Sequence, residues 1–380
     1  MARILLITHI YPPAIDGGSR VISKIGDYLQ KHHHQILVLT SCCHSTDDFT
    51  RHYTPISQKN LHILRLPVYT IFHRPLKLVS ATLSKGPIFK ILPFLKALKN
   101  IIDFSPDLII VGPFPTTMAL YALLIKRITK AKLLINPCFH PTDPDFSGFL
   151  LGKALKSADY IWAFTKFEIN YYQNQQISKQ KLFLLGNGID SSLLIKTEKH
   201  FPKIQTNLLY VGSFAAHKGL NTLIDSLVFL PASVSLTLAG QPSLYFPIIK
   251  KQISSLPLNI RNRIKIINSF PDSHLSQLID SSTVLILPSR QESFGLVLIE
   301  AMARKTPILT SDIPQLLELV NNSQAGLTFK VNDPQDLAQQ IQLIISHPKL
   351  QKSFGENGFK YVSTNYTWDK IGKNLCQKLF

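Results

Sequence analysis

Two glutamates stand eight residues apart around the junction of an expected strand and an expected helix. The apolar run 284–287 is typical of a buried strand, a loop carrying Glu292 follows it, and a helix beginning near Gly295 carries Glu300. Free backbone amides at the start of such a helix suit a phosphate group. Two carboxylates beside a bound anion would repel that anion, so packing alone explains the two glutamates poorly. Hydrogen bonds from sugar hydroxyls to the carboxylates explain them better. The plainer alternative is one surface glutamate and one glutamate in a helix salt bridge.

Two further loops have the composition of ligand-binding loops. Lys218 and Gly219 follow the expected strand 208–212 and precede a helix, and a mobile point charge suits a phosphate. An isolated lysine is more often simply solvated. Gly17 and Gly18 follow the first expected strand, where adjacent glycines let the backbone approach a ligand closely. An ordinary turn between a strand and a helix is the alternative there.

The segment 287–303 resembles the glutamate-x7-glutamate signature of retaining family 4 glycosyltransferases (glycosyl transferases group 1), which have the GT-B fold. The resemblance implies that Glu292 contacts the transferred sugar and that Glu300 contacts the ribose of the nucleotide. Glu292 thereby becomes a candidate catalytic residue. The donor-binding residues that it implies are Gly17, Gly18, Lys218, Arg290, Phe294, Gly295, Leu296 and Glu300.

Other segments resemble the same family, in the same order, across nearly the whole chain. They are the glycine loop 11–18, the interdomain hinge 187–190, the diphosphate-holding strand and loop 210–219, and the final segment 366–369. His140 follows the expected strand 132–136, and the resemblance implies that it reaches the donor sugar as a second catalytic residue. A single histidine is also commonly a structural loop or core residue.

The chain departs from the family pattern beside the expected diphosphate site. Where the family has an arginine directly after the glycine of the strand 208–212, this chain has Ser213. One diphosphate-binding charge is therefore missing, and His217 or Arg290 is a candidate substitute. A second departure is Asn268, where the family often has glycine beside the nucleotide base. The first departure leaves weak donor binding or a degenerate enzyme open.

Asp143-Pro144-Asp145 matches the Asp-x-Asp metal motif of the other glycosyltransferase fold. A chelating pair is expected at the end of a strand beside a nucleotide site. The surrounding proline and threonine residues indicate a loop instead. We therefore expect neither a metal nor a cofactor, with the nucleotide-diphosphate sugar acting as a substrate.

Short apolar runs alternate with helical patterns along the chain, which predicts an α/β fold of two Rossmann-like, doubly wound parallel sheets facing a cleft. The pattern breaks at the polar stretch after residue 187 and restarts near residue 208. The expected domains are an acceptor-side domain (1–186), a nucleotide-sugar domain (187–364) and a final helix that packs back on the first domain (365–380).

The composition limits the function classes. The chain has 380 residues, 45% of them hydrophobic, and a net charge of +18, which favours anionic partners. Four cysteines without a Cys-x-x-Cys pair exclude a disulfide framework and a zinc ribbon. We find no apolar run of about 20 residues that could cross a membrane. These features predict a cytoplasmic protein.

The basic residues concentrate in the first half of the chain. Residues 51–102 contain nine lysines and arginines and no acidic residue. Within them, Phe94, Leu95, Leu98, Ile101 and Ile102 are predicted to share one helical face, with lysines beside it. Such a helix suits the anionic inner surface of the cell membrane, and equally a helix packed on the sheet with solvated lysines.

These observations predict a retaining hexosyltransferase that moves a sugar from a nucleotide-diphosphate sugar to a glycan or lipid-linked acceptor, in cell-envelope polysaccharide or lipopolysaccharide synthesis. The alternatives are a catalytically degenerate binder of sugar nucleotides or membrane surfaces, a GT-B epimerase or phosphorylase, and a nucleic-acid-binding protein. The net charge alone favours the last, and no nucleic-acid-binding motif supports it.

Overall fold

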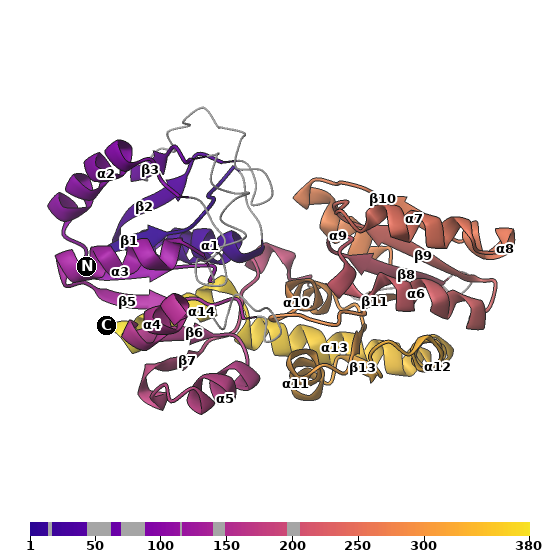
Figure 1. Ribbon diagram of the computed structural model, residues 1–380. Helices are drawn as coiled ribbons and strands as arrows, with labels where there is room; N and C mark the ends of the chain where they lie inside the picture. Colours follow the sequence, from indigo (N-terminus) through magenta and orange to yellow (C-terminus); the bar gives the residue numbers. More distant parts are fainter. Residues whose placement is uncertain (14–16, 44–61, 70–87, 115, 140–148, 196–205) are drawn as a thin grey trace. The chain divides into compact units, whose positions relative to one another are not determined.

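A computed structural model describes residues 1–13, 17–43, 62–69, 88–114, 116–139, 149–195 and 206–380. The chain divides into two compact units, Met1–Asn187 with Ile371–Phe380, and Gly188–Lys370. Each unit holds one sheet against which helices pack (Figure 1). The strands paired within both sheets of the described chain are all parallel, which confirms the predicted α/β fold of two Rossmann-like domains.

The first unit has a seven-stranded sheet in the order β3-β2-β1-β4-β5-β6-β7. Its strands are β1 (Arg3–Ile7), β2 (Gln35–Ser41), β3 (His62–Leu66), β4 (Leu108–Val111), β5 (Lys132–Ile135), β6 (Tyr160–Ala163) and β7 (Leu182–Leu184). Its helices are α1 (Gly17–Lys31), α2 (Ile91–Phe104), α3 (Met118–Thr129), α4 (Phe149–Ser157), α5 (Lys166–Asn174) and most of α14 (Trp368–Leu379).

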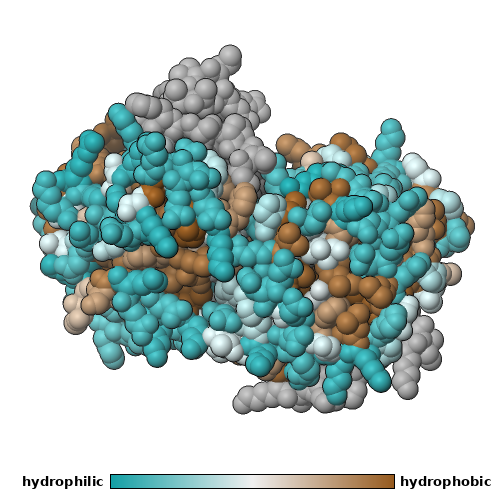
Figure 2. All heavy atoms as spheres, turned by 90° about the horizontal axis from the view of Figure 1, so that it is seen from below, coloured by the Kyte–Doolittle hydropathy of each residue, from teal (hydrophilic) through white to brown (hydrophobic). Residues whose placement is uncertain are grey.

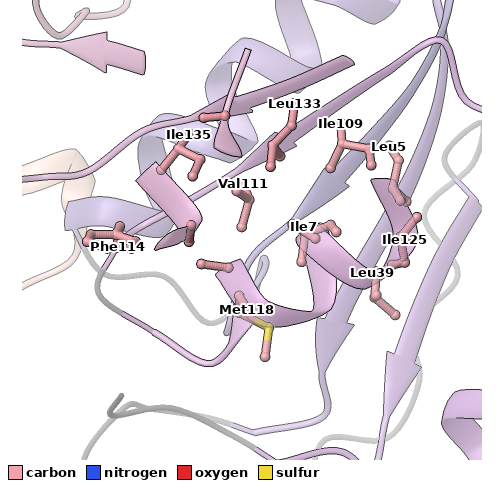
Figure 3. Packing of buried hydrophobic residues seen from close by; sticks show 14 of the residues in the cluster. Leu5, Ile7, Leu39, Ile109, Val111, Phe114, Met118, Ile125, Leu133 and Ile135 are labelled. Carbon is pink, nitrogen blue, oxygen red and sulfur yellow. The ribbon is translucent and has the colours of Figure 1, made fainter. Parts of the chain in front are cut away.

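The inner strands of the first sheet are buried on both faces, which is why they are continuous apolar runs. On one face, Leu5 and Ile7 of β1 join Met118 and Ile125 of α3 in a single hydrophobic cluster (Figure 3). On the other face, Leu6 of β1 meets α1 at Gly26, where an added Cβ would lie 2.6 Å from the Leu6 side chain. The alternation of side chains along β1 thus packs helices on both faces.

The second unit has a six-stranded sheet in the order β10-β9-β8-β11-β12-β13. Its strands are β8 (Thr206–Val211), β9 (Val234–Ala239), β10 (Ile264–Ile267), β11 (Val284–Leu287), β12 (Ile308–Ser311) and β13 (Gly326–Phe329). Its helices are α6 (Leu220–Ser226), α7 (Phe246–Ser254), α8 (Leu258–Arg261), α9 (Asp272–Asp280), α10 (Leu296–Ala303), α11 (Pro314–Ser323), α12 (Pro334–Ser346) and α13 (Pro348–Asn365).

Helix α14 begins in the second unit and ends in the first. Its residues from Ile371 onward belong to the first unit, where Gly372 lies against α1 so closely that an added Cβ would sit 2.2 Å from the Tyr28 ring. The ring of Phe380 stacks on His34 with centroids 5.0 Å apart. These contacts fasten the last ten residues to the first unit.

Hydrophilic residues cover most of the surface in Figure 2, with smaller hydrophobic patches between them. Among the described residues, no helix combines the length and the apolar character that a membrane crossing requires.

Candidate functional site

The candidate donor site lies where the strand order of the second sheet reverses. From β8 the chain runs outward through β9 and β10, and it then returns to pair β11 with β8 before continuing through β12 and β13. Ligands of doubly wound sheets bind outside the carboxyl ends of the strands at this kind of reversal. The loops that follow β8 and β11, residues 212–219 and 288–295, lie at that position.

Lys218 and Glu292 come from these two loops and form an ion pair. The Lys218 Nζ donates to Glu292 Oε2 at 2.6 Å, and the two side chains are only 16% and 11% exposed. The other carboxylate oxygen, Oε1, accepts a hydrogen bond of 3.3 Å from the backbone amide of Ser293. The two sequence-predicted residues are thus brought into contact, with a cation and a carboxylate presented together at the strand reversal.

Tyr210 on β8 lies near Glu292 and was not predicted from the sequence as a site residue. Its hydroxyl donates to the carbonyl oxygen of Ser213 at 2.7 Å, which holds the first turn of the loop 212–219. Burial raises the pKa of Tyr210 well above its ordinary value, and the nearby negative charge of Glu292 raises it further. The phenol therefore stays protonated and acts as a donor. The only sequence signal was a tyrosine two residues before Gly212.

Arg290 connects three loops at this edge of the sheet. Its backbone amide donates to His217 O at 2.7 Å, and its guanidinium donates to Ala216 O at 2.7 Å. The guanidinium Nε donates to Asn332 Oδ1 at 2.6 Å, from the loop after β13. These bonds hold the turn that presents Lys218. Sequence reasoning missed Asn332, which has a φ of +65°, because it lies 42 residues from Arg290.

Two glycines are required by the backbone of the site. Gly219 has a φ of +67°, and an added Cβ would lie 2.0 Å from the Pro288 carbonyl oxygen, so the two loops touch through backbone atoms there. Gly295 caps α10 with a φ of +81°, and Leu296 is the first residue of that helix. Both positions lie in the left-handed region that glycine adopts without steric cost.

The second predicted glutamate is buried on α10. Glu300 is only 6% exposed, four residues after the first residue of the helix. Phe294, just before the cap, is 3% exposed and packs edge-on against Tyr366, with ring centroids 5.4 Å apart. Phe294 therefore has a packing role that would hold the start of α10 in place.

Two of the residues predicted in the first unit lie at the reversal of its own sheet, between β1 and β4. Gly17 and Gly18 begin α1 after the loop that leaves β1. A Cβ on Gly18 would lie 2.7 Å from the Pro113 Cβ, whereas a Cβ on Gly17 would meet no atom within 4 Å. A side chain at position 18 would therefore collide with the loop after β4, which accounts for the glycine there. His140 lies outside the described residues.

The described part of the chain contains no cluster of three or more His, Cys, Asp or Glu residues able to hold a metal ion. Asp143 and Asp145, which carry the Asp-x-Asp motif, lie outside the residues that the structure describes.

Residues 194–361 match the family described as glycosyl transferases group 1. The matched residues lie within the second unit. The match covers the Lys218–Glu292 pair and Glu300, and it supports the predicted enzyme class, a glycosyltransferase. The chain is 28% identical over 218 residues to an uncharacterized glycosyltransferase of Methanocaldococcus jannaschii, which covers 57% of this chain and 58% of that relative.

Two solved structures share the whole fold. Sucrose-phosphate synthase from Thermosynechococcus elongatus has a TM-score of 0.79 at 20% identity, covering 99% of this chain and 98% of that one. Anabaena HepE in complex with UDP and glucose has a TM-score of 0.78 at 17% identity, covering 100% of this chain and 99% of that one. These similarities confirm the predicted GT-B fold class.

Proposed function

We propose that the chain is a retaining family 4 glycosyltransferase that moves a sugar from a nucleotide-diphosphate sugar to a glycan or lipid-linked acceptor. The observation that carries the proposal is the Lys218–Glu292 ion pair at the strand reversal of the group 1 domain. A cation and a carboxylate held together there suit the two parts of such a donor, its diphosphate and its sugar hydroxyls.

Each residue has a separate task in the proposed reaction. Lys218 neutralises the negative charge of the diphosphate, and this negative charge grows as the sugar–phosphate bond breaks. Glu292 binds the sugar, and Glu300 binds the ribose. Lys218 contacts Glu292 at 2.6 Å, so a diphosphate bound by Lys218 would compete with Glu292 for the ammonium group. Catalysis is then mainly positioning and stabilisation of the leaving group.

The donor in the proposal carries a nucleoside diphosphate, and it needs neither a metal nor a further cofactor. HepE binds UDP in its solved complexes, which supports UDP as the first nucleotide to test. The proposed acceptor belongs to cell-envelope polysaccharide or lipopolysaccharide and is met at the inner face of the membrane. The chain's +18 charge supports that location, because the acceptor surface there is anionic.

A thermal-shift panel of nucleoside diphosphates and nucleotide sugars tests donor binding. A ligand at 100 times its Kd stabilises its unit by about 2.7 kcal/mol. We expect one nucleotide to raise the transition of wild type selectively and to lose that effect in Glu300→Ala. The control is Glu356→Ala, which removes a carboxylate on α13 of the same unit. Absence of a shift with every nucleotide would refute the donor site.

Turnover is tested separately with the donor that the panel selects. A retaining transferase gives a product with the anomeric configuration of the donor, read by proton NMR. Binding without turnover on any acceptor would favour the degenerate binding protein that Ser213 motivates. Conversion of the free sugar nucleotide without an acceptor would identify an epimerase.

A further inference from the structure

Among the residues that the structure describes, helix α2 has a buried apolar face and, next to it, an exposed one. Phe94, Ala97 and Ile101 are buried against the core of the first unit. The predicted face Phe94, Leu95, Leu98, Ile101 and Ile102 is only partly buried, because Leu95 and Ile102 are 54% and 44% exposed. The second face consists of Ile91, Leu95, Leu98 and Ile102.

The spacing of this second face is that of one helical stripe. Its members recur at i, i+4, i+7 and i+11, which places them on one side of an α-helix. Ile91 is 66% exposed, and Leu98 is half-buried at the edge of the hydrophobic core. This stripe lies beside the buried face of α2, so it is not needed to hold α2 on the sheet.

Helix α3 extends the same surface. Tyr121 joins the two helices, because its hydroxyl accepts from the Phe89 amide at 2.9 Å and its ring lies 4.8 Å from the Phe94 ring. Leu124 and Ile128 stand three and seven residues after Tyr121, so they lie on the side of α3 that faces α2. Each is 43% exposed. Helices α2 and α3 lie side by side on one face of the sheet (Figure 1).

We call Ile91, Leu95, Leu98, Ile102, Leu124 and Ile128 the α2–α3 apolar face. Both helices also carry exposed basic side chains. Lys90, Lys96 and Lys99 are exposed on or beside α2, and Arg127 and Lys130 are exposed at the end of α3. Asp103 is the one acidic residue within α2 and α3. An apolar centre within a basic rim is complementary to a surface with an anionic layer above hydrocarbon.

We propose that the first unit binds an anionic phospholipid surface through the α2–α3 apolar face. The apolar side chains enter the boundary between headgroups and acyl chains, and the lysines pair with lipid phosphates. A second copy of the chain is a poorer occupant, because it would set one basic rim against another. The proposal concerns binding alone and stands apart from sugar transfer, since it needs no donor.

The test is co-sedimentation of the full chain with phosphatidylcholine vesicles, with and without 30 mol% (about one lipid in three) phosphatidylglycerol. We expect binding only to the anionic vesicles, and weaker binding as salt rises. Lys96→Gln with Lys99→Gln should weaken binding about thirty-fold, because each basic side chain near the surface contributes about fivefold. The matched control is Lys349→Gln with Lys360→Gln, two exposed lysines on α13 of the other unit.

The apolar part is tested with Leu95→Asn and Ile102→Asn together. We expect a loss on the order of tenfold or more, with the thermal transition of the first unit unchanged because both side chains are exposed. Leu343→Asn on α12, 43% exposed, is the control. Equal binding by wild type and both α2 variants would overturn the proposal. So would a wild-type dimer, seen by light scattering, that these variants dissociate.

Discussion

The Lys218–Glu292 pair allows a quantitative test of the site's electrostatics. Two unit charges about 4 Å apart attract by about 4 kcal/mol at an effective dielectric constant of about 20. Both side chains are nearly buried, so removing one partner leaves a desolvated charge. We expect Lys218→Met and Glu292→Gln each to lower the free energy of unfolding by about 3 kcal/mol. The double variant should lose only about 2 kcal/mol, giving a coupling energy of about 4 kcal/mol.

The assay is denaturant unfolding of the second unit, read by its own tryptophan. The chain has two tryptophans, Trp162 in the first unit and Trp368 in the second. Trp368 packs on Gly188, where an added Cβ would lie 2.6 Å from the indole ring. A Trp162→Phe background leaves Trp368 as the reporter, so a multi-step transition does not obscure the measurement.

The Lys305–Glu356 pair is the matched control for this cycle. It joins the same residue types at 3.0 Å in the same unit, but its glutamate side chain is 46% exposed. Its coupling energy should not exceed about 1 kcal/mol. If the Lys218 and Glu292 substitutions proved additive, with a combined loss of about 6 kcal/mol, the attraction derived from the structure would be refuted.

Three further predictions concern the backbone, the loop contacts and pH. Gly219→Ala should destabilise the second unit by about 3 kcal/mol or more, because the added Cβ would lie 2.0 Å from a carbonyl oxygen. The control is Gly152→Ala, since a Cβ on Gly152 would meet no atom within 4 Å. Thermal melts compare the two variants, and equal losses of stability would contradict the steric explanation. Arg290→Met should raise the Kd of the nucleotide that the thermal-shift panel selects about tenfold. Asn332→Ala should raise that Kd less, because Arg290 keeps its hydrogen bond to Ala216 O. Calorimetry measures both values, and an unchanged Kd with Arg290→Met would show that the contacts of Arg290 do not position Lys218. Burial and the charge of Asp27 raise the pKa of Tyr11 to about 12, so the folded first unit holds this proton more tightly than the unfolded chain does. Its stability should therefore fall by up to about 2.5 kcal/mol between pH 10 and 12. Tyr11→Phe should reduce that fall, and an identical pH profile in the variant would exclude this assignment.

Much of the fold was predictable because the inner strands are short apolar runs. The predicted strand 284–287 has the bounds of β11, and the helix predicted to begin near Gly295 is α10, which begins at Leu296. Strand β13 was not predicted, since Gly326-Leu-Thr-Phe has half-exposed residues at its centre and no unbroken apolar run. The edge strand β10 is as exposed as β13, but its isoleucines Ile264, Ile266 and Ile267 still mark it in the sequence.

The residues of the site were predictable one by one, but their contacts were not. Lys218 and Glu292 are separated by 74 positions, and only the pairing of β8 with β11 brings their loops together. Arg290 was predicted as a donor ligand or as a substitute for the charge missing at Ser213. Its bonds to Ala216 and Asn332 favour a role in holding the loop, a contact that no spacing in the sequence encodes.

The course of α14 has a consequence for biosynthesis. A ribosome makes residues 1–187 before the second unit, yet the contacts of Gly372 with Tyr28 and of Phe380 with His34 complete the first unit from residues made after the second unit. Nascent chains released before residue 371 would carry a complete second unit and a first unit that lacks the contacts of Gly372 and Phe380. The first unit is therefore complete only after the second unit has been translated.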